Sequence, residues 1–539
     1  MLLIIGLDGA DWRILDPWLR DGSLPTLAAL KSEGRWGNLT STIRPESSIA
    51  WTTFATGVNA GKHGIFGFIA QRPDDYAVTL NTAASVRAPT FWARAATAGR
   101  KIALLNLPMT YPPRAFPNGS LIAGMLTPDV RSSFTYPPEL RDALLDAVPN
   151  YVINVERTGM KLQPYIRATT AVIRARGQAA RWLMQQDDWD AMVVVFSATD
   201  RLQHAALHLL HPEHPRHDPA EARKLMPDLL AAYQAIDEAL AELLEEAGPD
   251  ATVIILSDHG FTPTARAFYV NTWLREQGWL TLRDAPRSRA GLWQKLRRHP
   301  GLRRLKRRLP LVQDIRRPPA PAPWLSSVDW TQTRAIYSPV GGIRFNVRGR
   351  EPQGIVAASE LEHVREELMA QLQTDAIDPE TKTLPFGGFF PREELYAGPY
   401  LSNAPDIILD ARREDSAARN SLIRARLAPE PFGDSGDLTG NHAAEGIILA
   451  YGASVQRPSS SQKGPSIHSA RLMDLAPTIL HLLGLAIPPE MDGQVLDFVR
   501  GDVTSAEASD VILSPHTTPD LSDEDQDIIQ ERLRSLGYL

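Results

Sequence analysis

The chain has 539 residues, of which 43% are hydrophobic and 22% are charged, the composition of an ordinary folded protein in water. Its formal net charge of -6 argues against non-specific binding of nucleic acid by the whole molecule. The absence of cysteine excludes disulfides, a thiolate nucleophile and a cysteine-based zinc site, so any metal must be held by oxygen atoms and imidazole nitrogens. Because this length exceeds one compact core, we expect a main domain with an insertion, or two domains.

The chain opens with a short apolar run, Leu2–Leu7, which meets Asp8 at once. The run lacks a basic leader and is much shorter than the roughly 20 residues of a membrane span. It is therefore typical of a buried strand and not of a signal peptide. On this basis we expect a cytoplasmic protein.

Further apolar runs are also typical of buried parallel strands, namely Lys101–Leu107, Ala191–Phe196, Thr252–Leu256 and Gly446–Ala450. Helical patterns lie between them, and the longest covers Pro219–Ala247, which ends before a Gly-Pro pair. The alternation of strands and helices predicts an α/β fold, with a mostly parallel central sheet flanked by helices on both faces.

The character of the sequence changes between residues 263 and 403, where we expect an inserted cap domain. Within it, segment 291–317 is strongly basic. This segment is typical of a solvated face, but it also fits peripheral contact with an anionic membrane, or steering of a negatively charged substrate. The other predicted parts are 1–262 and 404–500, which form the core, and 501–539, a C-terminal helical tail.

Three of the predicted strands run into an aspartate, and these are Asp8, Asp200 and Asp258. In parallel α/β sheets the ligand site lies outside the carboxyl ends of the strands, so the three carboxylates would converge on one edge. Like charges packed together are unfavourable unless a cation neutralises them. A single aspartate in such a place is more typical of a turn or a helix cap, but the three together indicate a metal site.

Histidines accompany the aspartates. His204 follows Asp200 at the i, i+4 spacing of one helix face, His259 follows Asp258 directly, and His442 precedes the last predicted strand. Oxygen and nitrogen ligands without sulfur suit Zn²⁺, Mn²⁺ or a similar divalent ion. His208 lies one further turn along, where a separate metal site is conceivable, but a polar loop after the ligand helix explains it better.

Two adjacent serines, Ser47 and Ser48, stand at the start of a short helical pattern. A serine in this place can cap the helix or act as a nucleophile. The residue types alone leave both roles open.

Six motifs occur in order along the chain: GLDGADW, SSIAWTTFATGVNAGKHGIFGF, ATDRLQH, ILSDHGF, GNHAAEGIILAYG and DLAPTILHLLGLAIPPEMDGQVL. As an ordered set they resemble the alkaline phosphatase superfamily, and the most similar branch is the type I phosphodiesterase/nucleotide pyrophosphatase group. The resemblance covers most of the chain. It implies an alkaline phosphatase-like fold and a site for phosphoryl transfer with two divalent metal ions, most simply Zn²⁺.

The resemblance also implies a role for individual residues. One metal would be held by Asp8, Ser47, Asp258 and His259. The other would be held by Asp200, His204 and His442. Alignment on the Thr56-Gly57 pair places the nucleophile at Ser47, and a slip of one residue would place it at Ser48 instead.

The chain departs from the family pattern at Phe68, where nucleotide pyrophosphatases carry an asparagine that helps to hold a phosphate oxygen. This difference weakens any transfer of nucleotide specificity. Arg44 or Lys62 could supply positive charge to the substrate instead, although each is also typical of an ordinary surface residue.

The function implied by the resemblance is hydrolysis of a phosphodiester or phosphoanhydride bond in a phosphorylated small molecule or nucleotide. A metal-activated serine would form a phosphoseryl-type intermediate. A phosphomonoesterase or phosphomutase on the same scaffold is the nearest alternative, and a non-catalytic binding protein stabilised by metal is a further one. We expect no specific binding of nucleic acid.

Overall fold

The computed structural model describes residues 1–539 except 73, 284–322, 411–420, 457–463, 506–520 and 537–539. The basic segment 291–317 lies outside the described residues, so its contact with a membrane stays a prediction. In the part that is described, no helix is both long enough and apolar enough to cross a lipid bilayer.

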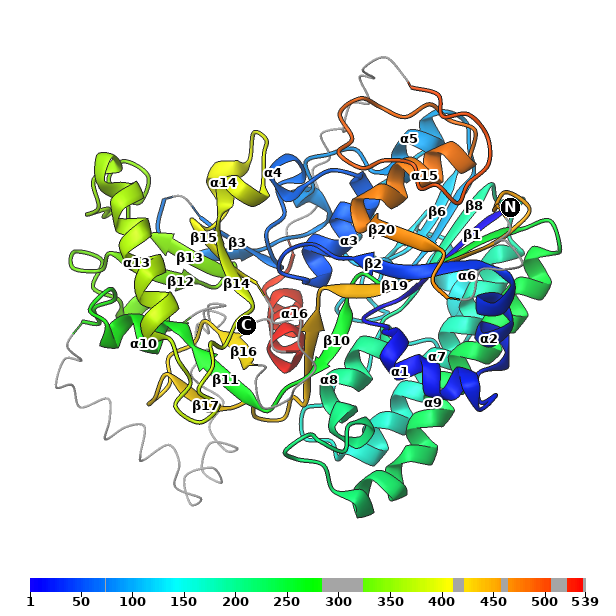
Figure 1. The fold of residues 1–539 in the computed structure, drawn as a ribbon. Helices are drawn as coiled ribbons and strands as arrows, with labels where there is room; N and C mark the ends of the chain where they lie inside the picture. Colours follow the sequence, from blue (N-terminus) through cyan, green and yellow to red (C-terminus); the bar gives the residue numbers. More distant parts are fainter. Residues whose placement is uncertain (73, 284–322, 411–420, 457–463, 506–520, 537–539) are drawn as a thin grey trace, which may run out of the picture.

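A nine-stranded sheet forms the centre of the molecule (Figure 1), in the order β20-β2-β19-β9-β1-β8-β5-β6-β7. In that order the strands are Ile467–Arg471, Arg35–Thr40, Glu445–Gly452, Thr252–Leu256, Leu2–Leu7, Ala191–Phe196, Ile102–Leu105, Gly119–Ile122 and Thr135–Tyr136. The five strands from β9 to β6 run parallel to one another. The prediction of a mostly parallel α/β sheet is therefore confirmed.

The strand predicted at Gly446–Ala450 exists, as part of β19, but its direction differs from the expected one. β19 pairs antiparallel with β9 on one side and with β2 on the other. Its residues from Gly446 to Ala450 are all buried, like those of the parallel strands. Because an apolar run indicates burial and carries no information on direction, the expectation of a parallel strand here is wrong.

Helices cover both faces of the sheet, which explains why β1 is buried along its whole length. On one face α5 (Phe91–Thr97) and α15 (Leu475–Leu482) pack with α3 (Ser47–Thr56). On the other face lie α7 (Leu162–Met184), α8 (Ala198–Leu210) and α9 (Pro219–Ala247). Shorter helices of this part are α1 (Trp12–Arg20), α2 (Pro25–Glu33), α4 (Ala60–His63) and α6 (Leu140–Ala147).

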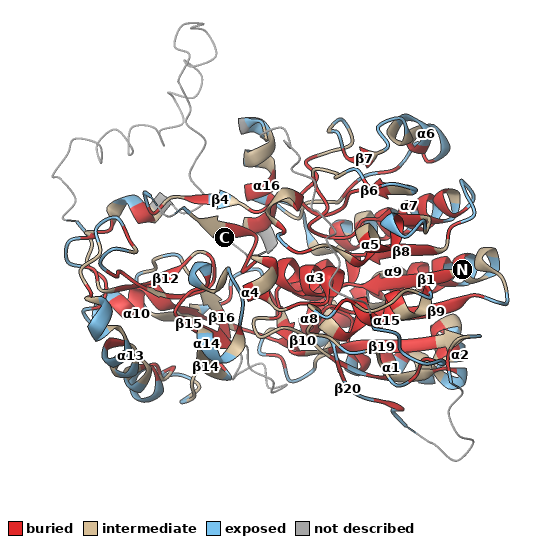
Figure 2. Cartoon of the chain, turned by 90° about the horizontal axis from the view of Figure 1, so that it is seen from above, coloured by how far each residue is buried: buried red, intermediate tan, exposed pale blue. Residues whose placement is uncertain are grey.

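A second hydrophobic core lies beside the central sheet, on the left in Figures 1 and 2. It contains a sheet of the order β12-β13-β15-β14, formed by Ala335–Ser338, Gly342–Phe345, Ile407–Asp410 and Gly388–Pro391. Apolar residues of α10 (Val270–Glu276) and α13 (Leu361–Asp375) pack into the same core. The division of the chain near residues 262, 403 and 500 stays a prediction.

A two-stranded ribbon connects distant parts of the chain at the carboxyl ends of the central strands. β10 (Gly260–Pro263) pairs antiparallel with β18 (Gly440–Ala443), and Phe261 lies opposite His442 in the register. β10 begins one residue after His259. The ribbon therefore brings His442 beside a segment that precedes it by more than 180 residues.

Candidate metal centre

The three aspartates that end the predicted strands meet at one edge of the sheet. Asp8 and Asp258 follow the neighbouring strands β1 and β9, and Asp200 lies in the first turn of α8, just after β8. All three side chains are completely buried. The convergence expected from the order of strands and helices is therefore present in the fold.

The aspartates and histidines form two clusters. In the first, His259 Nε2 lies 3.7 Å from Asp8 Oδ1 and 3.3 Å from Asp258 Oδ2. In the second, the Nε2 atoms of His204 and His442 lie 3.3 and 3.2 Å from Asp200 Oδ1. The clusters adjoin, because the rings of His259 and His442 stack with centroids 3.8 Å apart. Among the described residues, these are the two groups with the geometry to hold a metal ion.

Each of the three histidines turns its Nε2 toward its cluster because Nδ1 contacts a backbone carbonyl. The Nδ1 atoms of His204, His259 and His442 lie 3.0, 3.1 and 2.6 Å from carbonyl oxygens. These oxygens belong to Gly440, Gly260 and Pro45, respectively. Since a carbonyl only accepts, Nδ1 carries the proton and a neutral ring presents a lone pair at Nε2.

This orientation creates a conflict that a cation resolves. The Nε2 atoms of His204 and His442 are 3.0 Å apart, where two lone pairs repel each other. Asp8 Oδ1, Asp258 Oδ2 and both carboxylate oxygens of Asp200 are buried, with no hydrogen-bond partner in the described part of the chain. Unpaired buried carboxylates are costly, and carboxylate oxygen with imidazole nitrogen is a donor set for divalent ions. The residues present thus fit metal ions.

The pKa shifts in the site follow from burial and from neighbouring charge. Burial raises the pKa of Asp8 well above its usual value, and the charges of Asp258 and Asp200 add to this shift. Burial also raises the pKa of Asp258 to about 7, and the charge of Asp200 adds to it. Burial lowers the pKa of His442, so this ring is neutral, as a metal ligand must be.

The two adjacent serines lie in different surroundings. Ser47 is the first residue of α3 and is completely buried, and its Oγ lies 3.4 Å from His259 Nε2. The hydroxyl of Ser48 donates a hydrogen bond of 2.8 Å to Glu46 Oε1. The fold thus brings Ser47 to the first cluster and ties Ser48 to the residue that precedes the helix.

The two basic residues singled out in the sequence both have partners inside the protein. Arg44 donates to the carbonyl of Val340 at 2.6 Å and forms an ion pair with Glu46. Lys62 Nζ lies 2.5 Å from a carboxylate oxygen of Asp492. These contacts tie neighbouring segments together, and the role of Arg44 and Lys62 in substrate binding stays a prediction.

Two residues that the sequence interpretation did not place in the site contact its proposed members, one at a cluster aspartate and one at the alternative nucleophile. Trp51 Nε1 donates to Asp8 Oδ2 at 3.2 Å, and Glu46 accepts from the hydroxyl of Ser48. Trp51 lies four residues after Ser47, so one helix face carries both, and a buried indole N–H usually finds an acceptor. These two signals were available in the sequence, although they do not name Asp8 as the partner.

Two further histidines lie outside the clusters, and the expectation of a polar loop at His208 is wrong, because His208 is a buried residue of α8. His63 lies under α3, where its Nε2 is 3.1 Å from Thr53 Oγ1 and burial lowers its pKa to about 3. His208 is not part of either metal cluster found among the described residues. Its Nε2 lies 3.8 Å from Glu221.

Several solved proteins share this fold at low sequence identity. Phosphonoacetate hydrolase from Sinorhizobium meliloti 1021, solved with phosphonoformate, gives a TM-score of 0.52 at 16% identity over 90% of this chain and 95% of the other. Human ectonucleotide pyrophosphatase/phosphodiesterase 5 gives 0.50 at 15% identity, over 92% and 99% of the two chains. Alkaline phosphatase PafA gives 0.50 at 13% identity, over 93% and 98%. These likenesses show that the fold is alkaline phosphatase-like.

No curated protein sequence matches the chain. The family model described as type I phosphodiesterase/nucleotide pyrophosphatase matches residues 2–442, which include every residue of the two clusters and both serines. The resemblance inferred from the ordered motifs is confirmed. The chain therefore belongs to the type I phosphodiesterase/nucleotide pyrophosphatase family.

Proposed function

We propose that this protein hydrolyses phosphodiester or phosphoanhydride bonds, with Ser47 as the nucleophile. The observation that carries the proposal is the position of Ser47 Oγ, 3.4 Å from a histidine nitrogen at the edge of two adjacent clusters of metal-ligand type. A structural metal site would normally be closed by four protein ligands, none of them a serine. This arrangement therefore favours catalysis over a purely structural site.

Two divalent ions, Zn²⁺ or alternatively Mn²⁺, are the expected cofactors. The first would be held by Asp8, Ser47, Asp258 and His259, and the second by Asp200, His204 and His442. When bound, such ions supply positive charge that lowers the pKa of a nearby hydroxyl and stabilises charge on phosphoryl oxygens.

The chain itself positions the nucleophile. Ser47 lies at the first turn of α3, where the backbone amides and the helix dipole favour an anion close by. Trp51, one turn further along, fixes the Asp8 carboxylate through its indole N–H. Attack of Ser47 Oγ on phosphorus would expel the alcohol or phosphate leaving group and leave a phosphoseryl group. Water then cleaves that ester and restores the serine hydroxyl.

The substrate class proposed is a phosphorylated small molecule or a nucleotide. The Phe68 side chain belongs to the main hydrophobic core, so it offers no polar group where family members carry an asparagine. This difference keeps a phosphomonoesterase or phosphomutase as the second candidate, because the usual contact to a phosphate oxygen is missing.

The proposal can be tested with bis(p-nitrophenyl) phosphate and p-nitrophenyl phosphate. We expect the diester to be hydrolysed, activity to disappear after treatment with EDTA and dialysis, and activity to return when Zn²⁺ or Mn²⁺ is added. Hydrolysis of the monoester alone would favour the second candidate, a phosphomonoesterase or phosphomutase. Activity that persists fully without metal, or no activity on either compound after metal is restored, would contradict the proposal.

A further inference from the structure

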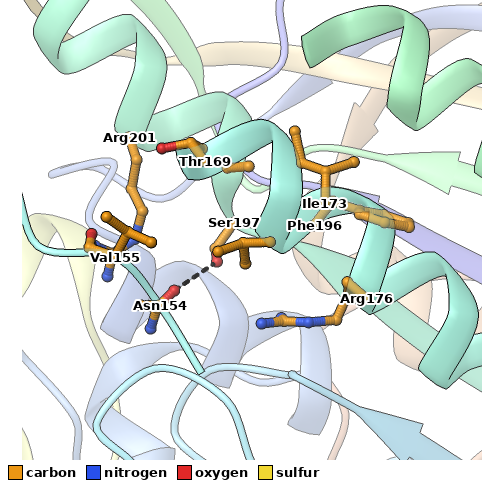
Figure 3. Close-up of a pocket in the computed structure, with 10 residues that line it drawn as sticks. Asn154, Val155, Thr169, Ile173, Arg176, Phe196, Ser197 and Arg201 are labelled. Carbon is orange, nitrogen blue, oxygen red and sulfur yellow. Dashed lines mark hydrogen bonds between the residues drawn. The ribbon is translucent and has the colours of Figure 1, made fainter. Parts of the chain in front are cut away.

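A small buried cavity lies between α7 and the first turn of α8 (Figure 3). It has about 10 Å³ of space, which is room for a single water-sized particle. Its apolar wall is formed by Val155, Val172, Ile173 and Phe196, and its polar wall includes Asn154, Ser197, Arg176 and Arg201. None of these residues belongs to the two metal clusters.

The guanidinium groups of Arg176 and Arg201 both reach toward Asn154 at this cavity (Figure 3). The two side chains are nearly fully buried, with 2% and 4% of the residue surface exposed. Two buried cations at one small cavity need compensation, because desolvation of an unpaired charge is unfavourable.

The protein compensates these charges only in part. Arg176 donates to the carbonyls of Ile153 at 2.7 Å and of Val195 at 3.5 Å and lies over the ring of Tyr151, and its Nε has no partner. Arg201 makes one long contact of 3.4 Å to the carbonyl of Val155, and both its Nε and its Nη2 lack a partner. The side-chain amide nitrogen of Asn154 also lacks one. Four N–H-bearing atoms at the cavity thus have no acceptor in the described part of the chain.

No carboxylate among the described residues forms an ion pair with either guanidinium. The nearby Glu156 lies 2.6 Å from Arg532 Nε, and Arg532 is itself buried. Burial lowers the pKa of Arg176, and repulsion from Arg201 lowers it further. The excess of positive charge and the unused N–H groups therefore both favour the binding of an anion.

We propose that this cavity binds one small monovalent anion of the halide type, with chloride as the ion in solution. Room for one water-sized particle favours a monatomic ion over phosphate, sulfate or an organic acid. The apolar wall suits a weakly hydrated ion, and α8 directs the positive end of its dipole toward the cavity from its start after Ser197. The inference does not depend on the proposed reaction.

Because the cavity lies close to the candidate metal centre, a bound anion would affect the helix that carries two of its residues. α8 begins at this cavity and carries Asp200 and His204, both ligands of the second cluster. An anion that neutralises Arg201, the residue next to Asp200, would stabilise the first turn of this helix. We therefore expect chloride to raise the thermal stability of the folded protein.

A direct test is a crystal structure of the wild-type protein grown in sodium bromide. The expected result is a peak of anomalous scattering between the guanidinium groups of Arg176 and Arg201. An ordered water, or no density, without anomalous signal at this position would overturn the proposal.

The solution test compares Tm in sodium chloride and in sodium gluconate at equal ionic strength. We expect chloride and bromide to raise the Tm of the wild type by about 3 °C relative to gluconate. Arg176→Met should abolish this difference, and Arg174→Met, which changes an exposed residue of the same helix, should keep it. Equal Tm values for the wild type in all three salts would contradict the proposal, whatever the variants do.

Discussion

Ser47 and Ser48 are neighbours in the sequence, but their hydroxyls have different contacts. Ser47 Oγ lies 3.4 Å from His259, and Ser48 Oγ donates to Glu46. Ser47→Ala should therefore reduce kcat by about 10⁴-fold or more, because the covalent route is lost. Ser48→Ala should cost about tenfold or less. Steady-state kinetics on the diester checks both values, and a reversal of the two effects would assign the nucleophile to Ser48.

Trp51 supports the metal centre through one hydrogen bond, from its Nε1 to Asp8 Oδ2 at 3.2 Å. Trp51→Phe removes this donor and keeps an aromatic ring in the core. Residues that orient metal ligands typically contribute a factor of 10 to 100 in metal affinity, so we expect a loss of about tenfold or more. Calorimetric titration of the metal-free protein with Zn²⁺ measures this loss of metal affinity. Trp92→Phe, a half-buried tryptophan outside both clusters, is the matched control and should leave affinity unchanged.

Asp258 links metal binding to pH. Because burial raises its pKa to about 7, a proton occupies this carboxyl below that pH and the metal must displace it. We expect the affinity for Zn²⁺ to fall by up to about tenfold per pH unit below about pH 7. Calorimetric titrations with Zn²⁺ at several pH values between about 6 and 8 would measure how the affinity changes with pH. A flat profile below pH 7 would contradict it.

The raised pKa of Asp258 has the opposite effect on the stability of the metal-free protein, which falls as the pH rises. The folded state holds the Asp258 proton more tightly than the unfolded state, whose carboxyl has the ordinary pKa of 3.8. The stabilising contribution of this proton is complete below pH 3.8 and is lost as the pH rises through about 7. Bound metal removes this dependence, since it replaces the proton.

The convergence of the proposed ligand side chains could be predicted from the sequence, because their positions follow from the order of the elements. An aspartate after a parallel strand must lie at the carboxyl edge of the sheet, and this placed Asp8 and Asp258 correctly. The contact of Trp51 with Asp8 and that of Ser48 with Glu46 could not be predicted. They depend on how α3 is rotated against β1, which packing decides and periodicity does not.

At the scale of elements, the packing of α3 on β1 requires a glycine in the strand. A Cβ atom added at Gly6 would lie 2.5 Å from Trp51 Cη2. Gly6→Ala should therefore lower the free energy of unfolding by about 1–3 kcal/mol, because a well-packed core resists added atoms. Denaturant unfolding measures the change.

A double-mutant cycle assigns this cost to the contact between the two elements. Phenylalanine has no Cη2 atom, so the Trp51→Phe background leaves room for the new methyl group. We expect Gly6→Ala to cost less in that background, with a coupling of about 1 kcal/mol. Additive effects would show that the clash lies elsewhere, for example at Val195.

The strands of the central sheet that could be predicted are those with an unbroken apolar run. β2 (Arg35–Thr40) escaped prediction because two of its six residues are buried, and its charged and polar side chains look like those of a loop. β19 was found, but its direction was not. Strand direction depends on the path by which the chain enters the sheet, and no local sequence pattern records this path.

At the scale of the whole molecule, the proposed metal ligands come from five separate segments, around residues 8, 47, 200, 258 and 442. Metal that binds only the folded state stabilises it by mass action. Removal of metal should lower Tm by about 5 °C or more for two tightly held ions. Differential scanning calorimetry with and without EDTA tests this, and addition of Zn²⁺ in excess should reverse it. An unchanged Tm would contradict the proposal that these segments hold metal ions together.

The position of β19 affects how the protein can be made. The strand between β9 and β2 is supplied by residues 445–452, so a ribosome must synthesise more than four-fifths of the chain before this gap can be filled. Until then, β2 has no partner on the side that faces β9, and His442 has not reached its cluster. Nascent chains shorter than this should remain sensitive to protease and dependent on chaperones, and metal loading should follow translation.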